Sequence, residues 1–385
     1  MPDCTLTTPL KSAKVLVLGD VTRKTDTWKQ MSTQFSYYEY NLTSREEFIH
    51  KLQTTFSDVN AIWITWEGFS PIGGLDDEIV AHLPSSLKMI VSCAVGYDHL
   101  NGAALAERGI TLCNAPGLAA APVADHVLLQ TLSLFRYTPI FEHILRRHGS
   151  TNTTRTAIST SGWDSETGRP LQHLCNQRLP DYDAARDHAP RFSLGAYVGG
   201  REVRQPRGHS VGIVGFGAIG REIGARLASI GMKVHYYKRS PLTSEETAAL
   251  GYEATYHSSL DSALQVSELL VLACPLTSDT LHMLNSRTFA LLPDGAKLIN
   301  IGRGKLIDTS ALLDALRAGK VTGAALDVFE SEPNVEPELL QRWDVLLTPH
   351  IASSTIETLQ GAEQICVDNM VNGFYGDGLS VTRVN

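Results

Sequence analysis

An arginine, a glutamate and a histidine each stand just beyond a short apolar segment that has the composition of a buried strand. Arg303 lies in NIGRGKLID, Glu332 in LDVFESEP and His350 in LTPHIASS. A guanidinium can grip an oxyanion with two hydrogen bonds, and an imidazole can deliver a proton near neutral pH. A carboxylate bonded to the far ring nitrogen raises the pKa of that imidazole and fixes its tautomer.

Together these three groups are the parts needed to reduce a 2-oxo acid. The reaction needs a hydride from a nicotinamide, a proton for the developing alkoxide and a fixed substrate carboxylate. Arg303 can also polarise the substrate carbonyl. Taken singly, each residue has an ordinary structural alternative: a surface ion pair for Arg303, a solvated loop carboxylate for Glu332, and a structural strand-end histidine for His350.

A glycine-rich turn supplies the expected cofactor site. Gly215, Gly217 and Gly220 form GFGAIG, with Ala218 and Ile219 between them, after the apolar run SVGIV and before the helical pattern REIGARLASIG. A strand, a tight turn and a helix N-terminus in this order can receive a pyrophosphate. The alternative is a tight turn that only permits close helix packing, but this context favours dinucleotide binding.

The end of the next apolar run bears on which dinucleotide is bound. An acidic residue would normally accept hydrogen bonds from the ribose of NAD here, but KVHYYKRS supplies Lys238, Arg239 and Ser240. Two cations and a hydroxyl suit a 2'-phosphate. We therefore predict NADP(H) as the preferred cofactor, with NAD(H) as the alternative if Lys238 and Arg239 merely end a strand in solvent.

The elements that must position these residues form two series. At 385 residues and 43% hydrophobic content, the chain is long enough for two cores. Short apolar runs alternate with helical patterns from residue 13 to 116, which predicts a parallel α/β sheet. Residues 121–148 predict one long helix, and residues 149–190 an irregular loop or inserted excursion. A second alternating series begins at SVGIVGFG.

The last apolar helical pattern, SSTIETLQGAEQICVDNMVNGF, must pack on something already folded. Assigning it to the first series gives a substrate domain of residues 1–120 and 353–385. The dinucleotide-binding domain is then residues 121–352.

The charge and composition of the chain limit the kinds of molecule that it can bind and where it is expected to act. A formal charge of −8 argues against a nucleic-acid surface. We find neither a signal sequence nor a run long enough to span a membrane, so we expect a cytoplasmic protein. The cysteines lack paired spacing and are expected to be reduced thiols, with no disulfide and no metal site; they are Cys4, Cys93, Cys113, Cys175, Cys274 and Cys366.

Seven sequence blocks carry a family resemblance: SCAVGYDHLN, ADHV, GHSVGIVGFGAIGREIG, CPLTSDTLHMLN, LINIGRGKLID, GAALDVFESEP and TPHIASST. With them the chain resembles the D-isomer-specific 2-hydroxyacid dehydrogenases over nearly all of its length apart from residues 149–190. The resemblance implies an α/β fold of two Rossmann-like and flavodoxin-like parallel-sheet domains, with the active site in the cleft between them. It also implies a homodimer.

The resemblance assigns roles to residues. Arg303 corresponds to the substrate-binding arginine, Glu332 to the acid partner and His350 to the proton donor. The backbone amides of Val95 and Gly96 correspond to the loop that receives the substrate carboxylate. Further cofactor contacts are expected at Cys274, Pro275, Ile301 and Asp327.

Details of the blocks refine the resemblance. Glutamate rather than glutamine at 332 fits the hydroxyacid enzymes and speaks against formate dehydrogenases. The KRS segment is similar to that of NADP-preferring glyoxylate, hydroxypyruvate and hydroxyphenylpyruvate reductases, and the entry to the glycine turn resembles fungal D-mandelate dehydrogenases. The alternatives are an NAD-linked dehydrogenase and a cofactor-sensing, corepressor-like interaction protein.

The substrate side chain stays open from sequence. Trp63, Trp66 and Tyr97 fall near expected strand ends, where they either line the pocket or take part in ordinary core and rim packing. A methylene in an apolar pocket is worth only about 1–3 kcal/mol, so small, branched and aromatic 2-oxo acids all remain candidates. The excursion at 149–190 is compatible with a cover, a dimer arm or disorder.

Overall fold

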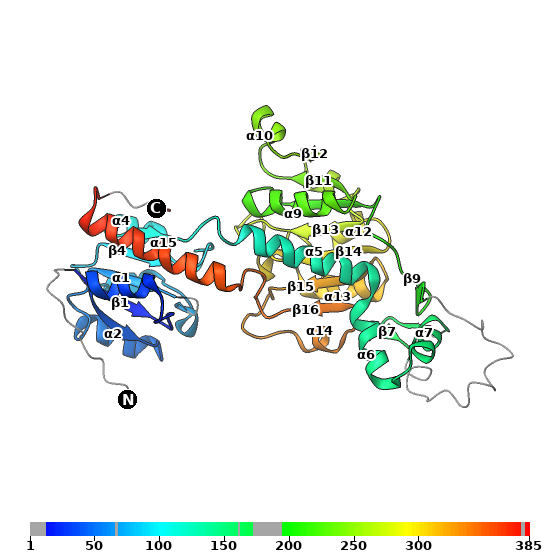
Figure 1. Ribbon diagram of the computed structural model, residues 1–385, viewed down its shortest axis with the longest axis horizontal. Coiled ribbons are helices and arrows are strands. Elements are labelled where there is room, and N and C mark those ends of the chain that lie inside the picture. Colours follow the sequence, from blue (N-terminus) through cyan, green and yellow to red (C-terminus); the bar gives the residue numbers. More distant parts are fainter. Residues whose placement is uncertain (1–12, 66–67, 161, 172–194, 379–381) are drawn as a thin grey trace. The chain divides into compact units, whose positions relative to one another are not determined.

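The computed structural model describes residues 13–65, 68–160, 162–171, 195–378 and 382–385. The chain divides into two compact units, one of Met1–Ala119 with Ser354–Asn385 and the other of Ala120–Ser353 (Figure 1). Each is an α/β unit built on a parallel sheet, as the sequence predicts.

The first unit contains a five-stranded parallel sheet in the order β2-β1-β3-β4-β5. The strands are β1 (Lys14–Leu18), β2 (Ser36–Tyr40), β3 (Ala61–Ile64), β4 (Met89–Ser92) and β5 (Thr111–Cys113). The helices are α1 (Asp26–Gln34), α2 (Arg45–Gln53), α3 (Asp77–His82), α4 (Gly102–Glu107) and α15 (Ile356–Tyr375), with a short 3₁₀ turn η1 (Ser70–Ile72). Apolar clusters cover both faces of the sheet, as expected of parallel strands.

Helix α15 returns from the end of the chain to pack on the first unit beside α1 and β4. Its buried residues Ala362, Cys366, Val367 and Met370 complete the core that holds Trp63. Trp63 is only 1% exposed, so the alternative of ordinary core packing is the correct one for this residue. Tyr97 is 39% exposed, and Trp66 lies outside the described residues.

The second unit contains a seven-stranded, wholly parallel sheet in the order β12-β11-β10-β13-β14-β15-β16. The strands are β10 (Ser210–Val214), β11 (Lys233–Tyr237), β12 (Ala254–His257), β13 (Leu269–Leu272), β14 (Ala296–Asn300), β15 (Val321–Leu326) and β16 (Val345–Leu347). The chain order reverses at the neighbouring strands β10 and β13. Ligands of doubly wound sheets bind beyond the carboxyl ends of the strands at such a switch point.

Helices cover both faces of this sheet. Helices α5 (Ala120–Arg136) and α9 (Ala218–Ser229) lie side by side on one face (Figure 1). The other elements of this layered region are α10 (Ser244–Ala248), α11 (Leu260–Leu264), α12 (Ser286–Leu291), η3 (Gly304–Leu306), α13 (Thr309–Arg317) and α14 (Pro337–Gln341). Those from α11 to α14 contribute to the apolar cluster on the opposite face.

The expectation of one helix over residues 121–148 is wrong, because the segment forms two helices. Helix α5 ends at Arg136, Tyr137 adopts a left-handed conformation with φ 50°, and α6 runs from Thr138 to His148. Pro139 explains the break: within a continuous helix its ring would clash with the Phe135 carbonyl and it has no N–H to donate.

The prediction of an irregular stretch at 149–190 is wrong for the part of this stretch that the structure describes, which contains a helix and a short antiparallel ladder. Helix α7 (Thr151–Thr160) buries Thr154, Ala157 and Ile158 and packs against α6. Two short antiparallel ladders follow, β6 (Trp163–Asp164) with β7 (Arg169–Pro170) and β8 (Tyr197–Val198) with β9 (Arg201–Glu202). Packing overrides the weak helix propensity of a threonine-rich segment.

The cysteines that the structure describes are free thiols. Cys93, Cys113 and Cys366 are buried in the first unit, and Cys274 is partly buried in the second. Cys4 and Cys175 lie outside the described residues. Within the described ranges no helix is long and apolar enough to cross a membrane.

Candidate active site

His350 and Glu332 are brought together by the loops that follow β16 and β15. The His350 ring nitrogen Nδ1 lies 3.2 Å from the Glu332 carboxylate oxygen Oε2. The other carboxylate oxygen, Oε1, accepts a hydrogen bond of 2.8 Å from the Phe329 backbone N–H. Glu332 is therefore fixed in place by its own turn, and it can hold one ring nitrogen while leaving Nε2 for other chemistry.

The electrostatics of this pair favour a charged imidazole. The hydrogen bond to Glu332 is the main cause that raises the pKa of His350 above its ordinary value, although burial opposes it. Burial favours the protonated form of Glu332, but the hydrogen bonds from His350 and Phe329, together with the charges of His350 and Arg303, lower the pKa of that carboxyl. The nearby Arg303 guanidinium favours the ionised Glu332 and disfavours the charged His350.

Asp327 secures the loop that carries His350. His350 has φ 55°, a conformation that is uncommon for a residue with a side chain and is often retained at functional sites. The buried Asp327 carboxylate accepts hydrogen bonds from the Ile351 and Ala352 backbone N–H groups at 2.9 and 2.8 Å. It also accepts one of 2.6 Å from the Thr348 hydroxyl. Contacts on both sides of His350 thus hold its backbone in this conformation.

Arg303 stands in a tight turn after β14 that is shaped by a buried asparagine. The Asn300 side chain accepts a hydrogen bond from the Gly302 N–H at 3.0 Å and donates one to the Arg303 carbonyl at 2.9 Å. A Cβ at Gly304 would lie 1.8 Å from the Phe329 carbonyl. That glycine therefore serves close packing against the segment leading to Glu332, which brings the Arg303 turn toward the His350 pair.

The glycine turn between β10 and α9 has the geometry of a dinucleotide site. Gly215 has φ 94°, and a Cβ there would lie 2.6 Å from the backbone of Ala273 and Cys274. A Cβ at Gly220 would lie 2.2 Å from the Gly215 carbonyl oxygen, whereas one at Gly217 would meet open space. Gly217 is the N-cap of α9, and no side chain caps this helix end. The glycine turn therefore leaves room for a phosphate against the N-terminus of α9.

The remaining members of the glycine turn and the segment after β11 complete this region. Ala218 and Ile219 form the first turn of α9. Lys238 is half-buried, while Arg239 and Ser240 are exposed. Lys238 helps to lower the pKa of Glu246, for which the main favourable cause is the Thr243 backbone N–H. No carboxylate occupies residues 238–240.

The other expected cofactor contacts follow neighbouring strands. Cys274 and Pro275 follow β13, and Ile301 follows β14. Burial raises the pKa of the Cys274 thiol to about 11, so this side chain stays neutral near pH 7. Asp327 follows β15, and its carboxylate helps to hold the His350 loop through hydrogen bonds from two backbone N–H groups.

Val95 and Gly96 belong to the first unit, in the loop after β4. The Asn114 side chain donates a hydrogen bond of 2.8 Å to the Val95 carbonyl, and Ala115 donates to the Ala94 carbonyl. In the described part of this unit, the Val95 and Gly96 N–H groups have no hydrogen-bond acceptor. Such free amides in a braced loop can receive an oxyanion.

Sequence analysis did not identify the residues that support the predicted catalytic side chains. Asn300 and Thr348 stand in the NIGRGKLID and LTPHIASS segments, but the sequence does not reveal their contacts. Asn300 bonds within its own turn, and Thr348 bonds to Asp327, which follows the neighbouring strand. His126 comes from the ADHV block, and its Nε2 lies 3.2 Å from the Thr348 hydroxyl oxygen. Among the described residues, no group of three histidine, cysteine or acidic side chains forms a metal site.

Comparison with known proteins shows to which family the chain is related. Residues 190–352 match the family model of the D-isomer specific 2-hydroxyacid dehydrogenase NAD binding domain. The chain is 30% identical to 4-methyl-2-oxopentanoate reductase A of Aspergillus oryzae, over 92% of this chain and 93% of that protein.

The chain is also similar to solved structures of 2-hydroxyacid dehydrogenases and reductases. Holo D-mandelate dehydrogenase of Rhodotorula graminis matches with a TM-score of 0.81 and 29% identity, over 98% of each chain. The NADPH-dependent glyoxylate/hydroxypyruvate reductase of Sinorhizobium meliloti, in complex with NADP and malonate, matches with a TM-score of 0.72 and 27% identity, over 97% of this chain and 96% of that one.

The chain belongs to the D-isomer-specific 2-hydroxyacid dehydrogenase family. It is accordingly an oxidoreductase of the D-2-hydroxyacid dehydrogenase and 2-oxo acid reductase class. Its cofactor is a nicotinamide dinucleotide.

Proposed function

We propose that this protein is an NADPH-preferring reductase that converts 2-oxo acids to D-2-hydroxy acids, with His350 as the proton donor. The observation that carries the proposal is the contact of 3.2 Å between His350 Nδ1 and Glu332 Oε2. The carboxylate holds the imidazole charged through one nitrogen, so Nε2 can give its proton to the substrate oxygen.

Each side chain has one task in the proposed reaction. When bound, the reduced nicotinamide supplies the hydride to the carbonyl carbon. Arg303 binds the substrate and stabilises negative charge on the carbonyl oxygen, while the Val95 and Gly96 amides receive the carboxylate. His350 protonates the oxygen, which leaves a neutral imidazole beside the ionised Glu332.

The proposed cofactor site uses the glycine turn and the segment after β11. The α9 N-terminus at Gly217 would hold the pyrophosphate, and Lys238, Arg239 and Ser240 would bind the 2'-phosphate of NADPH. The absence of a carboxylate from residues 238–240 supports this preference. Further contacts with the dinucleotide are proposed for Ala218, Ile219, Cys274, Pro275, Ile301 and Asp327.

Several 2-oxo acids are candidate substrates. The relatives are named for 4-methyl-2-oxopentanoate, mandelate, glyoxylate and hydroxypyruvate, which differ in the group beside the carbonyl but share the 2-oxo or 2-hydroxy acid. The proposal therefore covers this class, and the exposed Tyr97 is a candidate for contact with the variable group.

Initial rates of NADPH and NADH oxidation test the proposal. The panel contains glyoxylate, hydroxypyruvate, 4-methyl-2-oxopentanoate, phenylpyruvate, 4-hydroxyphenylpyruvate and benzoylformate, and chiral chromatography identifies the product enantiomer. We expect turnover with NADPH to exceed that with NADH and to give the D product. Faster turnover with NADH would favour an NAD-linked dehydrogenase. No turnover despite tight cofactor binding would favour a cofactor-sensing protein.

We further propose that the protein is a homodimer, as the family resemblance implies, and that it is cytoplasmic, as expected from its sequence. Leu129 and Leu132 on α5 are 61% and 40% exposed, and a partner subunit would cover such apolar side chains. Light scattering coupled to gel filtration tests the dimer, because a monomer at micromolar concentration would contradict it.

A further inference from the structure

Lys297 is a charged residue in the middle of an otherwise apolar sheet. It is the second residue of β14, between Leu269 of β13 and Gly323 of β15. All five residues of this strand are buried, and Lys297 is only 8% exposed. Lysine is almost never buried in this way without an anionic partner, so its presence here requires a physical reason.

The ammonium group of Lys297 lacks that partner in the described part of the chain. Its hydrogen bond there is with the Thr322 hydroxyl, at 3.2 Å, and no described carboxylate lies within 4 Å of it. The rings of Phe135 and Tyr137 lie 5.4 and 5.2 Å from Nζ. Cation–π contacts of this kind offset only a small part of the cost of removing a charge from water.

The buried charges nearby do not balance. The Asp344 carboxylate is already shared: it lies 3.0 Å from the Arg342 guanidinium and 3.7 Å from that of Arg201. Arg201 also donates to the Thr322 carbonyl, at 2.8 Å. Three cations, the buried Arg342 and Lys297 and the partly buried Arg201, thus face one buried carboxylate among the described residues.

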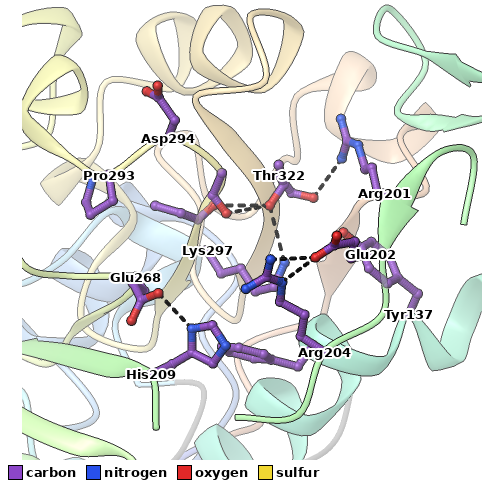
Figure 2. Close-up of a pocket in the computed structure, with 13 residues that line it drawn as sticks. Tyr137, Arg201, Glu202, Arg204, His209, Glu268, Pro293, Asp294, Lys297 and Thr322 are labelled. Atoms are coloured by element: carbon purple, nitrogen blue, oxygen red, sulfur yellow. Dashed lines mark hydrogen bonds and ion pairs between the residues drawn. The ribbon is translucent and has the colours of Figure 1, made fainter. Parts of the chain in front are cut away.

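A cavity of 340 Å³ opens beside Lys297 (Figure 2). It lies at the amino-terminal edge of the seven-stranded sheet, because its walls include the first residues of β14 and β15 and the segment before β10. The catalytic residues follow the carboxyl ends of these strands, so the cavity is separate from the candidate active site. Lys297, Arg201, Arg204 and His209 all line it.

The carboxylates around the cavity are already engaged and lie toward solvent. Glu202 accepts from Arg204 at 2.8 Å, and Glu268 lies 2.7 Å from the His209 ring nitrogen (Figure 2). Glu202 and Glu268 are 52% and 43% exposed. Asp294 is 93% exposed and pairs with Lys320 at 2.8 Å. None of them neutralises the buried Lys297.

We propose that this cavity is a binding site for a small doubly charged oxyanion, a dicarboxylate or a phosphate, which supplies the missing counter-charge for Lys297. Arg201 adds a second cation to the wall, Arg204 lies at its exposed side in a pair with Glu202, and the Thr322 hydroxyl orients the lysine. The volume accommodates an anion of this size. This binding site is independent of the proposed reductase activity.

The site is sensitive to pH through Lys297. Burial, followed by the charge of Arg201, lowers the pKa of Lys297 to about 8, against the opposing effect of Asp344. Burial raises the pKa of the facing Tyr137 phenol, so that phenol stays neutral across the same range. Since the anion requires the charged lysine, its affinity should fall about tenfold between pH 7 and pH 9.

The test is calorimetric titration of the full chain, saturated with NADP⁺, with sodium sulfate at constant ionic strength. Sulfate remains a dianion from pH 7 to 9, and NADP⁺ occupies the proposed 2'-phosphate subsite. The variants are Lys297→Met, which nearly preserves volume, and Lys320→Met as the matched control at the rim. Any sulfate bound at Arg303 is common to all variants and cancels.

We expect the wild type and Lys320→Met to bind one more sulfate than Lys297→Met. The affinity for this additional sulfate should fall about tenfold between pH 7 and pH 9. Equal binding by Lys297→Met and the wild type would overturn the proposal, as would pH-independent binding by the wild type. If Lys297→Met does not fold, Arg204→Ala takes its place and must weaken sulfate binding. At the site that Lys297→Met removes, malonate binding tighter than inorganic phosphate would identify a dicarboxylate site, and the reverse a phosphate site.

Discussion

Glu332→Gln isolates the charge of the carboxylate that holds His350. The amide has nearly the same shape and keeps an oxygen for the Phe329 N–H, which donates at 2.8 Å in the wild type. It can also donate a hydrogen bond to His350 Nδ1, which lies 3.2 Å from Oε2. The variant therefore removes the preference for a charged imidazole while changing the packing little.

The size of the effect follows from the hydrogen bond. A charge-assisted hydrogen bond is worth roughly 1.5–3 kcal/mol and a neutral one roughly 0.5–1.5 kcal/mol, so the substitution costs about 1–1.5 kcal/mol. The His350 and Glu332 side chains are 53% and 38% exposed, and solvent screening reduces the difference to about 1 kcal/mol. That is about a fivefold change in the ratio of charged to neutral imidazole.

The sign of the pH effect is set by the raised pKa of His350. In the wild type the acid is charged at low pH, and activity falls as the pH rises through this raised pKa. In Glu332→Gln the fall begins at lower pH, so kcat/KM for 2-oxo acid reduction should be nearly unchanged at the acidic end and about fivefold lower on the basic limb.

The assay is kcat/KM for reduction from pH 5 to 9.5 at saturating NADPH. Glu330→Gln is the matched control, because Glu330 pairs with His282 at 2.7 Å in the same unit but outside the proposed catalytic group. The Glu330→Gln substitution should leave the pH dependence of kcat/KM unchanged. A basic limb that does not move in Glu332→Gln, or an equal loss of rate at every pH, would refute the role of the charge.

Three further substitutions test other parts of the site. Arg239→Ala should weaken NADPH binding by about 1–2 kcal/mol, or 5- to 30-fold, and leave NADH binding nearly unchanged; equal weakening in a fluorescence titration would remove the 2'-phosphate assignment. Asp327→Asn should lower kcat by up to about 100-fold, because the His350 loop loses its charged anchor; an unchanged kcat would contradict this positioning. Gly304→Ala should destabilise the fold by about 1–3 kcal/mol, because its Cβ meets the Phe329 carbonyl; an unchanged urea midpoint would show that the turn can relax.

The sequence predicts the fold class and the family because each signal is local. The glycine turn, the apolar strand runs and the blocks around Arg303 and His350 each lie within a dozen residues. The break between α5 and α6 also had a local signal in Pro139, but the apolar periodicity on both sides concealed it. The left-handed Tyr137 lets the chain change direction there.

Features that depend on tertiary contacts could not be predicted. Helix α7 has little intrinsic propensity and forms because Ala157 and Ile158 are buried. The Asp327 carboxylate contacts backbone N–H groups 24 and 25 residues away along the chain. The missing counter-charge of Lys297 becomes visible only when its neighbours across the sheet are known.

His350→Ala tests whether His350 is the group that protonates the substrate. Turnover of the best 2-oxo acid with NADPH is measured alongside the dissociation constant of NADPH in the same preparation. We predict a loss of about 10²- to 10⁴-fold in kcat with cofactor binding unchanged. A turnover rate equal to that of the wild type would show that His350 is not the proton donor.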